Sequence, residues 1–163
     1  MTSPTSYSLP QIALHWVVAV VIAAQYLLDD GIGEAWHAVR DGLAPTYGPL
    51  VLAHIVGGVL VLALVAWRLG LRLRHGAPPP PEDEHPALQK AAKATHWALY
   101  ALLIILPVSG LVAWFGGIRD AAEVHEILTN VLLGLVGLHV AAALFHHFVL
   151  KSEVMRRMVR PTA

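Results

Sequence analysis

The sequence predicts an all-α fold, an integral membrane four-helix bundle. Of the 163 residues, 56% are hydrophobic and 13% are charged, whereas about 25% of the residues of a soluble domain carry charge. Mean hydropathy is +0.61. Four stretches contain no Lys, Arg, Asp or Glu, and each is about as long as the 17–25 residues that cross a bilayer. These stretches are residues 11–28, 49–67, 97–118 and 127–150, and we expect the helices to cover about 11–29, 49–73, 92–114 and 124–150.

The first predicted span begins after Pro10 and ends at Asp29, Asp30 and Gly31. No basic region precedes its apolar run and no small-residue cleavage site follows it, so it does not resemble a cleavable signal peptide. We therefore expect it to remain as a transmembrane helix. The segment from Gly31 to Gly48 is polar, and we expect an irregular loop there on the outer side.

The second predicted span begins near Pro49 and finishes in Arg68-x-x-x-Arg72, whose long side chains can reach the lipid headgroups. The loop that follows contains four consecutive prolines at 78–81 and then Glu82-Asp83-Glu84. Such a sequence favours a stiff, extended connector without a core of its own.

The third predicted span starts with Lys90 and contains Pro107, which a membrane helix tolerates as a kink. The fourth starts around Glu123 and runs to Lys151, so the outer segment between the two spans, residues 115–124, is expected to be a short loop. No repeat of 20 to 50 residues and no soluble domain is visible. Residues 1–163 are therefore expected to form a single transmembrane domain.

Basic residues are distributed unevenly between the two sides of the predicted bundle. Only Arg40 and Arg119 fall on the side of the first loop. The positive-inside rule then places both termini and the middle loop in the cytoplasm, and the chain as a multi-pass protein of the bacterial inner membrane. The other basic residues all fall on the middle loop, its flanks or the C-terminal tail: Arg68, Arg72, Arg74, Lys90, Lys93, Lys151, Arg156, Arg157 and Arg160.

The chain contains no cysteine. Disulfides, thiolate-ligated iron–sulfur clusters, cysteine zinc sites and covalent haem attachment through a Cys-x-x-Cys-His motif are therefore excluded. Any metal must be held by histidine, carboxylate or methionine.

Histidines lie at two depths in the predicted spans. With the N-terminus inside, His15 and His96 lie near the inner ends of the first and third spans, and His54 and His125 near the outer ends of the second and fourth. His139 follows His125 by fourteen residues, which brings it within about 40° of the same helix face and about 21 Å along the axis. An imidazole in hydrocarbon is costly without a partner, so these residues are candidates for a functional site.

Histidines at two levels of a helix bundle are typical of two haem b groups, each held by axial imidazoles from two facing helices. Two strong axial ligands leave the iron no open position, which favours electron transfer over oxygen binding. We expect His15, His54, His125 and His139 to be the metal ligands. Depth alone leaves His96 as an alternative inner ligand.

Two further residues are predicted to contact the cofactors. Gly57, three residues after His54, removes a side chain from the face where a flat macrocycle would lie. Arg68 follows His54 by fourteen residues and returns to nearly the same face, where its guanidinium can pair with haem propionates. Close helix packing is the alternative for Gly57, because small residues mark helix interfaces in membranes.

The order of these motifs along the chain is distinctive. It resembles the bacterial cytochrome b561 family over nearly the whole chain, and within that family it is most similar to the four-helix dihaem superoxide oxidases. The matching motifs are Leu14-His15-Trp16, His54-x-x-Gly57 leading to Arg68-Leu69-x-x-Arg72, His96-x-x-x-Tyr100, Pro107-x-x-Gly110, His125-Glu126-x-Leu128, Leu138-His139-x-Ala141-Ala142-Ala143-Leu144-x-His146-His147 and Arg156-Arg157-Met158.

The resemblance implies one haem between His15 and His139, a second between His54 and His125, and no ligand role for His96. It also implies that His146 lies beside a quinone at the inner surface, where we expect it to be the catalytic group that exchanges protons. Imidazole is suited to this because histidine as a residue type titrates near neutral pH. The alternative for His146 is an anchor at the headgroups or a bond to a propionate. The short outer segment departs from the family pattern, which leaves the electron donor open.

The expected activity is the oxidation of superoxide, or another small external donor, at the periplasmic side and the reduction of ubiquinone in the membrane. An alternative is a quinol-linked haem b subunit that exchanges electrons with a partner redox protein. A histidine-lined zinc or proton path is a third possibility, but no carboxylate inside a span is expected to face the interior of the bundle. Membrane lipid and quinone are expected partners, and nucleic acid is not.

Overall fold

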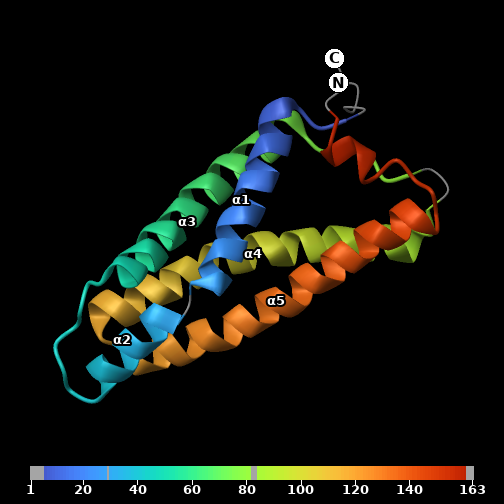
Figure 1. Cartoon of the computed structure of the whole chain (residues 1–163). Coiled ribbons are helices and arrows are strands. Elements are labelled where there is room, and N and C mark those ends of the chain that lie inside the picture. Colours follow the sequence, from blue (N-terminus) through green and yellow to red (C-terminus); the bar gives the residue numbers. More distant parts are fainter. Residues whose placement is uncertain (1–5, 29, 82–83, 161–163) are drawn as a thin grey trace.

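The computed structural model describes residues 6–28, 30–81 and 84–160. Within these ranges the chain is all-helical, and four of its helices are long and apolar enough to cross a membrane (Figure 1). The predicted membrane four-helix bundle is thereby confirmed. The helices are α1 (Leu9–Leu27), α2 (Asp30–Arg40), α3 (Pro49–His75), α4 (Pro86–Gly116), α5 (Arg119–Phe148) and the short 3-10 helix η1 (Arg156–Met158).

Helices α1 and α3 begin within two residues of the predicted positions because proline and capping side chains mark their starts, whereas α4 begins at Pro86 and α5 at Arg119, several residues before the predicted 92 and 124. At the start of α1, the backbone N–H of Ser8 donates to Oε1 of Gln11 at 2.9 Å, and α3 begins at Pro49. The amide of Gln11 also donates to the carbonyl of Gly76 at 3.1 Å. This bond joins the start of α1 to the end of α3. Of the residues in the predicted boundaries, Asp29 and the pair 82–83 lie outside the described part of the chain.

The outer segment between the third and fourth spans is shorter than predicted. Instead of a ten-residue loop over 115–124, α4 continues to Gly116 and α5 begins at Arg119. Gly117 makes this turn possible, because its φ of +64° is in the left-handed region that residues with a side chain rarely adopt. Helices α4 and α5 therefore form one tight hairpin.

The prediction of an irregular loop over residues 31–48 is wrong for its first part. Residues Asp30–Arg40 form α2, which packs against α3 with Ala35 buried. Two glycines and several polar residues hide the helical period in this segment, but Ala35, Trp36 and Val39 share one face. Tertiary contact with α3 stabilises a helix that has little apolar character of its own.

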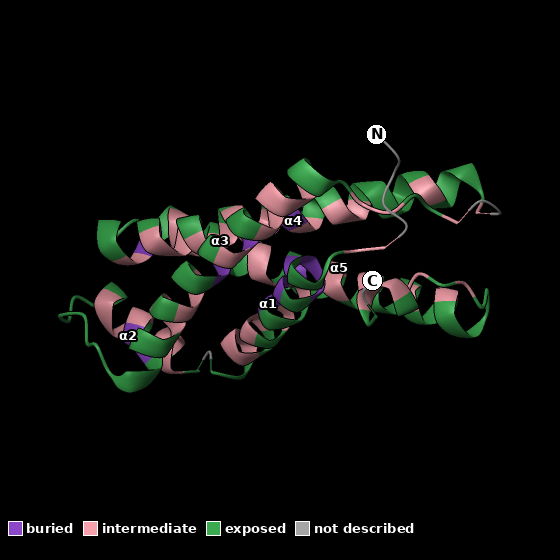
Figure 2. Cartoon of the chain, turned by 90° about the horizontal axis from the view of Figure 1, so that it is seen from above, coloured by how far each residue is buried: buried purple, intermediate pink, exposed green. Residues whose placement is uncertain are grey.

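The spans pack in sequence around a small core. Helix α1 lies along α3, α3 along α4, and α4 along α5, and the buried side chains Val18, Val61, Val65 and Tyr100 meet where α1, α3 and α4 converge. Most other apolar side chains are exposed, as Figure 2 shows along every long helix. In a membrane protein such surfaces face lipid, so wide exposure is expected.

Both described ends of the chain lie at the same end of the bundle, beside the loop between α3 and α4 (Figure 1). The C-terminal segment is fixed there by two bonds. The indole Nε1 of Trp16 donates to the carbonyl of Met158 at 2.9 Å, and Nη1 of Arg157 donates to the carbonyl of Pro79 at 2.7 Å. We call this end the inner end and the opposite one the outer end.

Candidate functional site

At the outer end, one pair of histidines bridges α3 and α5. His54 lies in the second turn of α3 and His125 in the second turn of α5. Their ring centroids are 6.3 Å apart and the ring planes are inclined by 69°.

At the inner end, a second pair bridges α1 and α5 with almost the same geometry. The ring centroids of His15 and His139 are 6.3 Å apart, with an interplanar angle of 72°. Because His125 and His139 share a face of α5 and are fourteen residues apart, the two pairs are separated by about 21 Å along that helix.

The spacing of both pairs fits two axial imidazoles on one metal. A metal–nitrogen bond of about 2.0–2.1 Å on each side, with each nitrogen about 1.1 Å from its ring centre, separates two opposed imidazole centroids by about 6.3 Å. The planes of two such rings both contain the axis through the metal and are free to rotate about it. Angles of 69° and 72° are therefore compatible with axial ligation.

The helix packing and the donor set also fit haem. Among the described residues, α5 packs closely only against α4, so each histidine pair joins two helices whose backbones are not closely packed, which leaves room for a macrocycle between them. No three His, Cys, Asp or Glu side chains of the described ranges gather as metal ligands. Two imidazoles suffice for haem iron, which the porphyrin already holds, but not for a structural zinc site.

The ring of His125 is oriented by α4. Its Nδ1 lies 2.9 Å from the carbonyl of Leu106 and 3.2 Å from the hydroxyl of Ser109. A carbonyl only accepts, so Nδ1 carries the proton and Nε2 is left to bind a metal. Gly110 lies against the same ring: a Cβ built there would be 2.9 Å from its Cε1. Helix α4 therefore fixes both the tautomer and the position of this imidazole.

The space above Gly57 is filled by Gln25 of α1. A Cβ at Gly57 would lie 2.5 Å from Oε1 of Gln25, and the amide of Gln25 donates to the carbonyl of His54 at 2.8 Å. Gly57 therefore permits a close approach of α1 and α3, the alternative considered from the sequence. Its predicted contact with haem stays a prediction.

His96 lies beside the inner pair but at a different spacing. Its ring centroid is 5.3 Å from that of His139, about 1 Å shorter than two opposed ligands require. Its Nδ1 contacts the carbonyl of Ala92, one turn back on α4, at 2.6 Å. The geometry thus favours His15 over His96 as the partner of His139.

Arg68 lies at the junction of α1, α3 and α4, at the inner edge of the core. Its Nε donates to the hydroxyl of Tyr100 at 3.1 Å and its Nη1 to the carbonyl of Gln11 at 2.6 Å. The guanidinium is therefore at the inner level, as predicted, and two of its nitrogens stabilise the helix junction. Its predicted pairing with a propionate stays a prediction.

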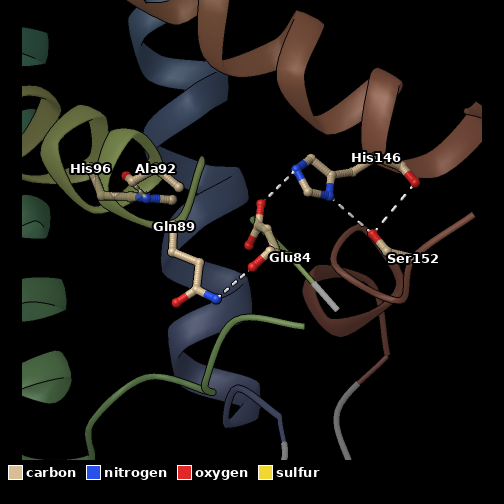
Figure 3. Close-up of polar contacts among 6 residues, drawn as sticks. All are labelled: Glu84, Gln89, Ala92, His96, His146 and Ser152. Atoms are coloured by element: carbon tan, nitrogen blue, oxygen red, sulfur yellow. Dashed lines mark hydrogen bonds and ion pairs between the residues drawn. The ribbon is translucent and has the colours of Figure 1, made fainter. Parts of the chain in front are cut away.

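His146 lies about two turns beyond His139, at the inner end of α5. Its Nε2 is 3.1 Å from Oε1 of Glu84, and its Nδ1 is 3.1 Å from the hydroxyl of Ser152 (Figure 3). It is therefore held in a polar cluster by the inner loop and the C-terminal segment. The predicted contact with quinone stays a prediction.

Sequence reasoning missed the residues that support the histidines. Leu106 acts through a carbonyl, which carries no sequence signal, and Glu84 and Ser152 reach His146 only through the tertiary arrangement of loop and tail. Gly110 had a signal, the Pro107-x-x-Gly110 motif, but not an assigned role.

Comparison with known proteins identifies the family of the chain. The family model described as prokaryotic cytochrome b561 matches residues 6–161. The chain belongs to the prokaryotic cytochrome b561 family. It is 35% identical to a protein named cytochrome b562 from Cereibacter sphaeroides, with 99% of each chain covered.

Two further relatives of this cytochrome b561 family member cover most of its length. It is 31% identical to the probable superoxide oxidase CybB of Yersinia pestis, over 94% of this chain and 95% of that protein. It is 29% identical to cytochrome b561 homolog 1 of Escherichia coli, over 94% and 96%. Membership in the family makes the chain a membrane cytochrome and implies haem b as its cofactor.

Proposed function

We propose that the protein carries two bis-histidine haem b groups and transfers electrons from superoxide at the periplasmic side to ubiquinone at the cytoplasmic side of the inner membrane. The observation that carries this proposal is the equal 6.3 Å spacing of two histidine pairs on different levels of the bundle. His54 and His125 would hold the outer haem, and His15 and His139 the inner one. Such haems supply one-electron transfer without an open coordination position.

The residues around the pairs have supporting roles in this proposal. The carbonyl of Leu106 orients His125 so that Nε2 would be free to bind the metal. Arg68, with its charge at the inner level, would balance the propionates of the inner haem. The orientation, with both termini cytoplasmic, is supported by the excess of basic residues at the inner end.

Superoxide as donor is supported by the relative named as a probable superoxide oxidase. The test uses purified protein, a superoxide source and ubiquinone-1. We expect haem reduction by superoxide and net formation of ubiquinol, with two haems per chain in a pyridine haemochrome assay. A single haem, or haems that superoxide does not reduce, would refute the proposal.

The charge of the outer surface favours a second candidate donor, a basic redox protein. Among the described residues, the outer end exposes six carboxylates against the two arginines, and a surface of this sign repels an anion and attracts a cationic partner. These carboxylates are Asp30, Glu34, Asp41, Asp120, Glu123 and Glu126.

Ionic strength separates the two donors. Salt screens charges over about 10 Å at 0.1 M. If superoxide is the donor, its reaction with the outer haem should accelerate as salt screens the repulsion. If a basic protein is the donor, purified protein should be reduced slowly by superoxide at every salt concentration, and quickly by the partner at low salt alone.

A further inference from the structure

The polar cluster at the inner end is built from three separate segments. His146 comes from the last turn of α5, Ser152 from the segment after it, and Glu84 from the loop before α4 (Figure 3). The side chain of Glu84 is only 5% exposed and that of His146 14% exposed. A buried carboxylate needs a charged or hydrogen-bonding partner, and the imidazole of His146 supplies one.

The position of Glu84 is fixed by its own backbone rather than left to a mobile loop. Its N–H donates to the carbonyl of Pro81 at 3.1 Å, and its carbonyl accepts from the amide of Gln89 at 2.9 Å. The loop is also held at Pro79 by Arg157. The carboxylate is therefore presented to His146 by an anchored segment.

The position of Ser152 is fixed in a similar way. Lys151 adopts a φ of +51°, which reverses the chain after α5, and the N–H of Ser152 then donates to the carbonyl of His146 at 2.9 Å. This places the hydroxyl of Ser152 3.1 Å from Nδ1 and 3.4 Å from the carbonyl of the same histidine.

This arrangement accommodates His146 with and without a proton on Nδ1. A carboxylate only accepts, so Nε2 keeps its proton toward Glu84 in both forms. In the neutral form the hydroxyl of Ser152 donates to Nδ1. In the protonated form Nδ1–H donates to that hydroxyl, which rotates and donates to the carbonyl of His146. Nδ1 is thus the ring atom where a proton is gained and lost.

We propose that Glu84 is a positioning residue for quinone reduction, whose carboxylate holds His146 through Nε2 so that a proton on Nδ1 passes through the hydroxyl of Ser152 to the quinone. This inference rests on the proposed function. Two superoxide ions each release one electron and become O₂, and two electrons with two protons convert ubiquinone to ubiquinol. In each proton transfer the Nδ1–H bond of His146 breaks as its proton passes to the hydroxyl of Ser152, the proton of that hydroxyl forms the quinone O–H bond, and cytoplasmic water then reprotonates His146.

The test compares Glu84→Gln with Glu84→Asp and with a matched control. Glutamine keeps the shape and an accepting oxygen, so a purely structural role of Glu84 would survive the change, whereas the negative charge is lost. Glu153→Gln removes another inner-surface carboxylate, which pairs with Arg156 in solvent with both side chains about 60% exposed. It controls for a general loss of surface charge.

The measurement is stopped-flow reoxidation of chemically reduced protein by ubiquinone-1, which needs no superoxide. We expect the maximal rate of Glu84→Gln to fall by about 10- to 100-fold, less than the 10²–10⁴ of general acid–base catalysis itself. The quinone concentration for half-maximal rate should change little, because Glu84 does not contact the quinone. Haem content and reduction by superoxide should be unchanged, and Glu84→Asp should recover part of the rate.

The other outcomes overturn the inference in distinguishable ways. A wild-type rate in Glu84→Gln, or equal slowing in Glu153→Gln, would remove the role of Glu84 and leave the proposed function intact. Loss of the inner haem in Glu84→Gln would assign the residue to haem retention instead. Wild-type protein that ubiquinone does not reoxidise would refute the proposed function, and this inference with it.

Discussion

The outer and inner histidine pairs have the same spacing but different surroundings. At the outer level His125 has one partner ring, that of His54, and is fixed on its other side by Leu106 and Ser109 of α4. At the inner level His139 has two neighbouring rings, His15 at 6.3 Å and His96 at 5.3 Å. In both cases α4 contributes the residue beside the pair.

This difference shows that α4 plays a different part at each histidine pair. At the outer level it orients a ligand through a carbonyl and makes room for the ring with Gly110. At the inner level it adds a third imidazole whose own Nδ1 is bonded to Ala92. The surroundings therefore fix the orientation of a ligand in the outer pair. In the inner pair, only the ring spacing distinguishes His15 from His96 as the partner of His139.

The largest effect should follow the removal of His125, the proposed ligand of the outer haem on α5. A His125→Ala variant should lose the outer haem and keep the inner one, because the ring of His125 lies at the spacing of an opposed ligand from that of His54. A pyridine haemochrome assay should then give one haem per chain. Two retained haems would contradict the outer pairing.

The inner level is tested by two matched variants. His15→Ala should lose the inner haem, while His96→Ala should keep both, because only the His15 ring lies at the distance of an opposed ligand. Haem content and low-spin optical bands are the measurements. The reverse pattern would show that His96, not His15, is the inner partner.

A smaller effect is expected from crowding the outer ring. In Gly110→Ala the added Cβ would be 2.9 Å from Cε1 of His125, and overpacking of this kind costs about 1–3 kcal/mol. The outer haem should be lost at a lower temperature in a melting experiment followed by its absorbance, and the inner haem should be unaffected.

The control for that variant is Gly134→Ala, since a Cβ there meets nothing within 4 Å. Its melting curve should match that of the wild type or shift slightly upward, because alanine favours helix over glycine. Equal destabilisation by both variants would show that these glycines are needed for the packing of helices α4 and α5, and that Gly110 has no specific role beside the ring of His125.

The smallest effect should come from the hydroxyl beside His125. Ser109→Ala leaves the carbonyl of Leu106 as acceptor of Nδ1–H and removes one weaker contact at 3.2 Å. With less hydrogen bonding the imidazole donates less charge, so the potential of the outer haem should rise. A hydrogen bond of about 0.5–1.5 kcal/mol corresponds to about 20–60 mV for one electron.

Redox titration of both haems measures this shift. The inner haem should keep its potential, because Ser109 lies at the outer level with His125. A fall in the outer potential, or an equal change in both, would contradict the proposed orientation of His125 by α4.

Much of the fold could be predicted from the sequence because a bilayer imposes a length and an apolar composition on each span. Helix α2 could not, since its two glycines weaken the local signal and its stability depends on packing against α3. The turn at Gly117 was missed for a related reason: the polar residues from Arg119 onward extend α5 beyond its apolar part. Composition marks where lipid begins, not where a helix begins.

The histidine pairs could be predicted in part because depth and helix face follow from residue number. Their partners could not be chosen by depth alone, as His15 and His96 illustrate, and the structure adds the ring spacing that separates them. The contact of Glu84 with His146 depends on how a loop and a tail meet. The local sequence of neither segment predicts that tertiary contact.

The two-residue turn between α4 and α5 has a consequence for how the protein is assembled. Helices joined so closely are expected to enter the membrane together as a hairpin, and this hairpin holds one histidine of each proposed pair, His125 and His139. The opposing histidines, His54 and His15, arrive on α3 and α1. Haem would then complete its ligation only when the two halves meet, so that cofactor capture joins the halves and serves as the last step of biogenesis.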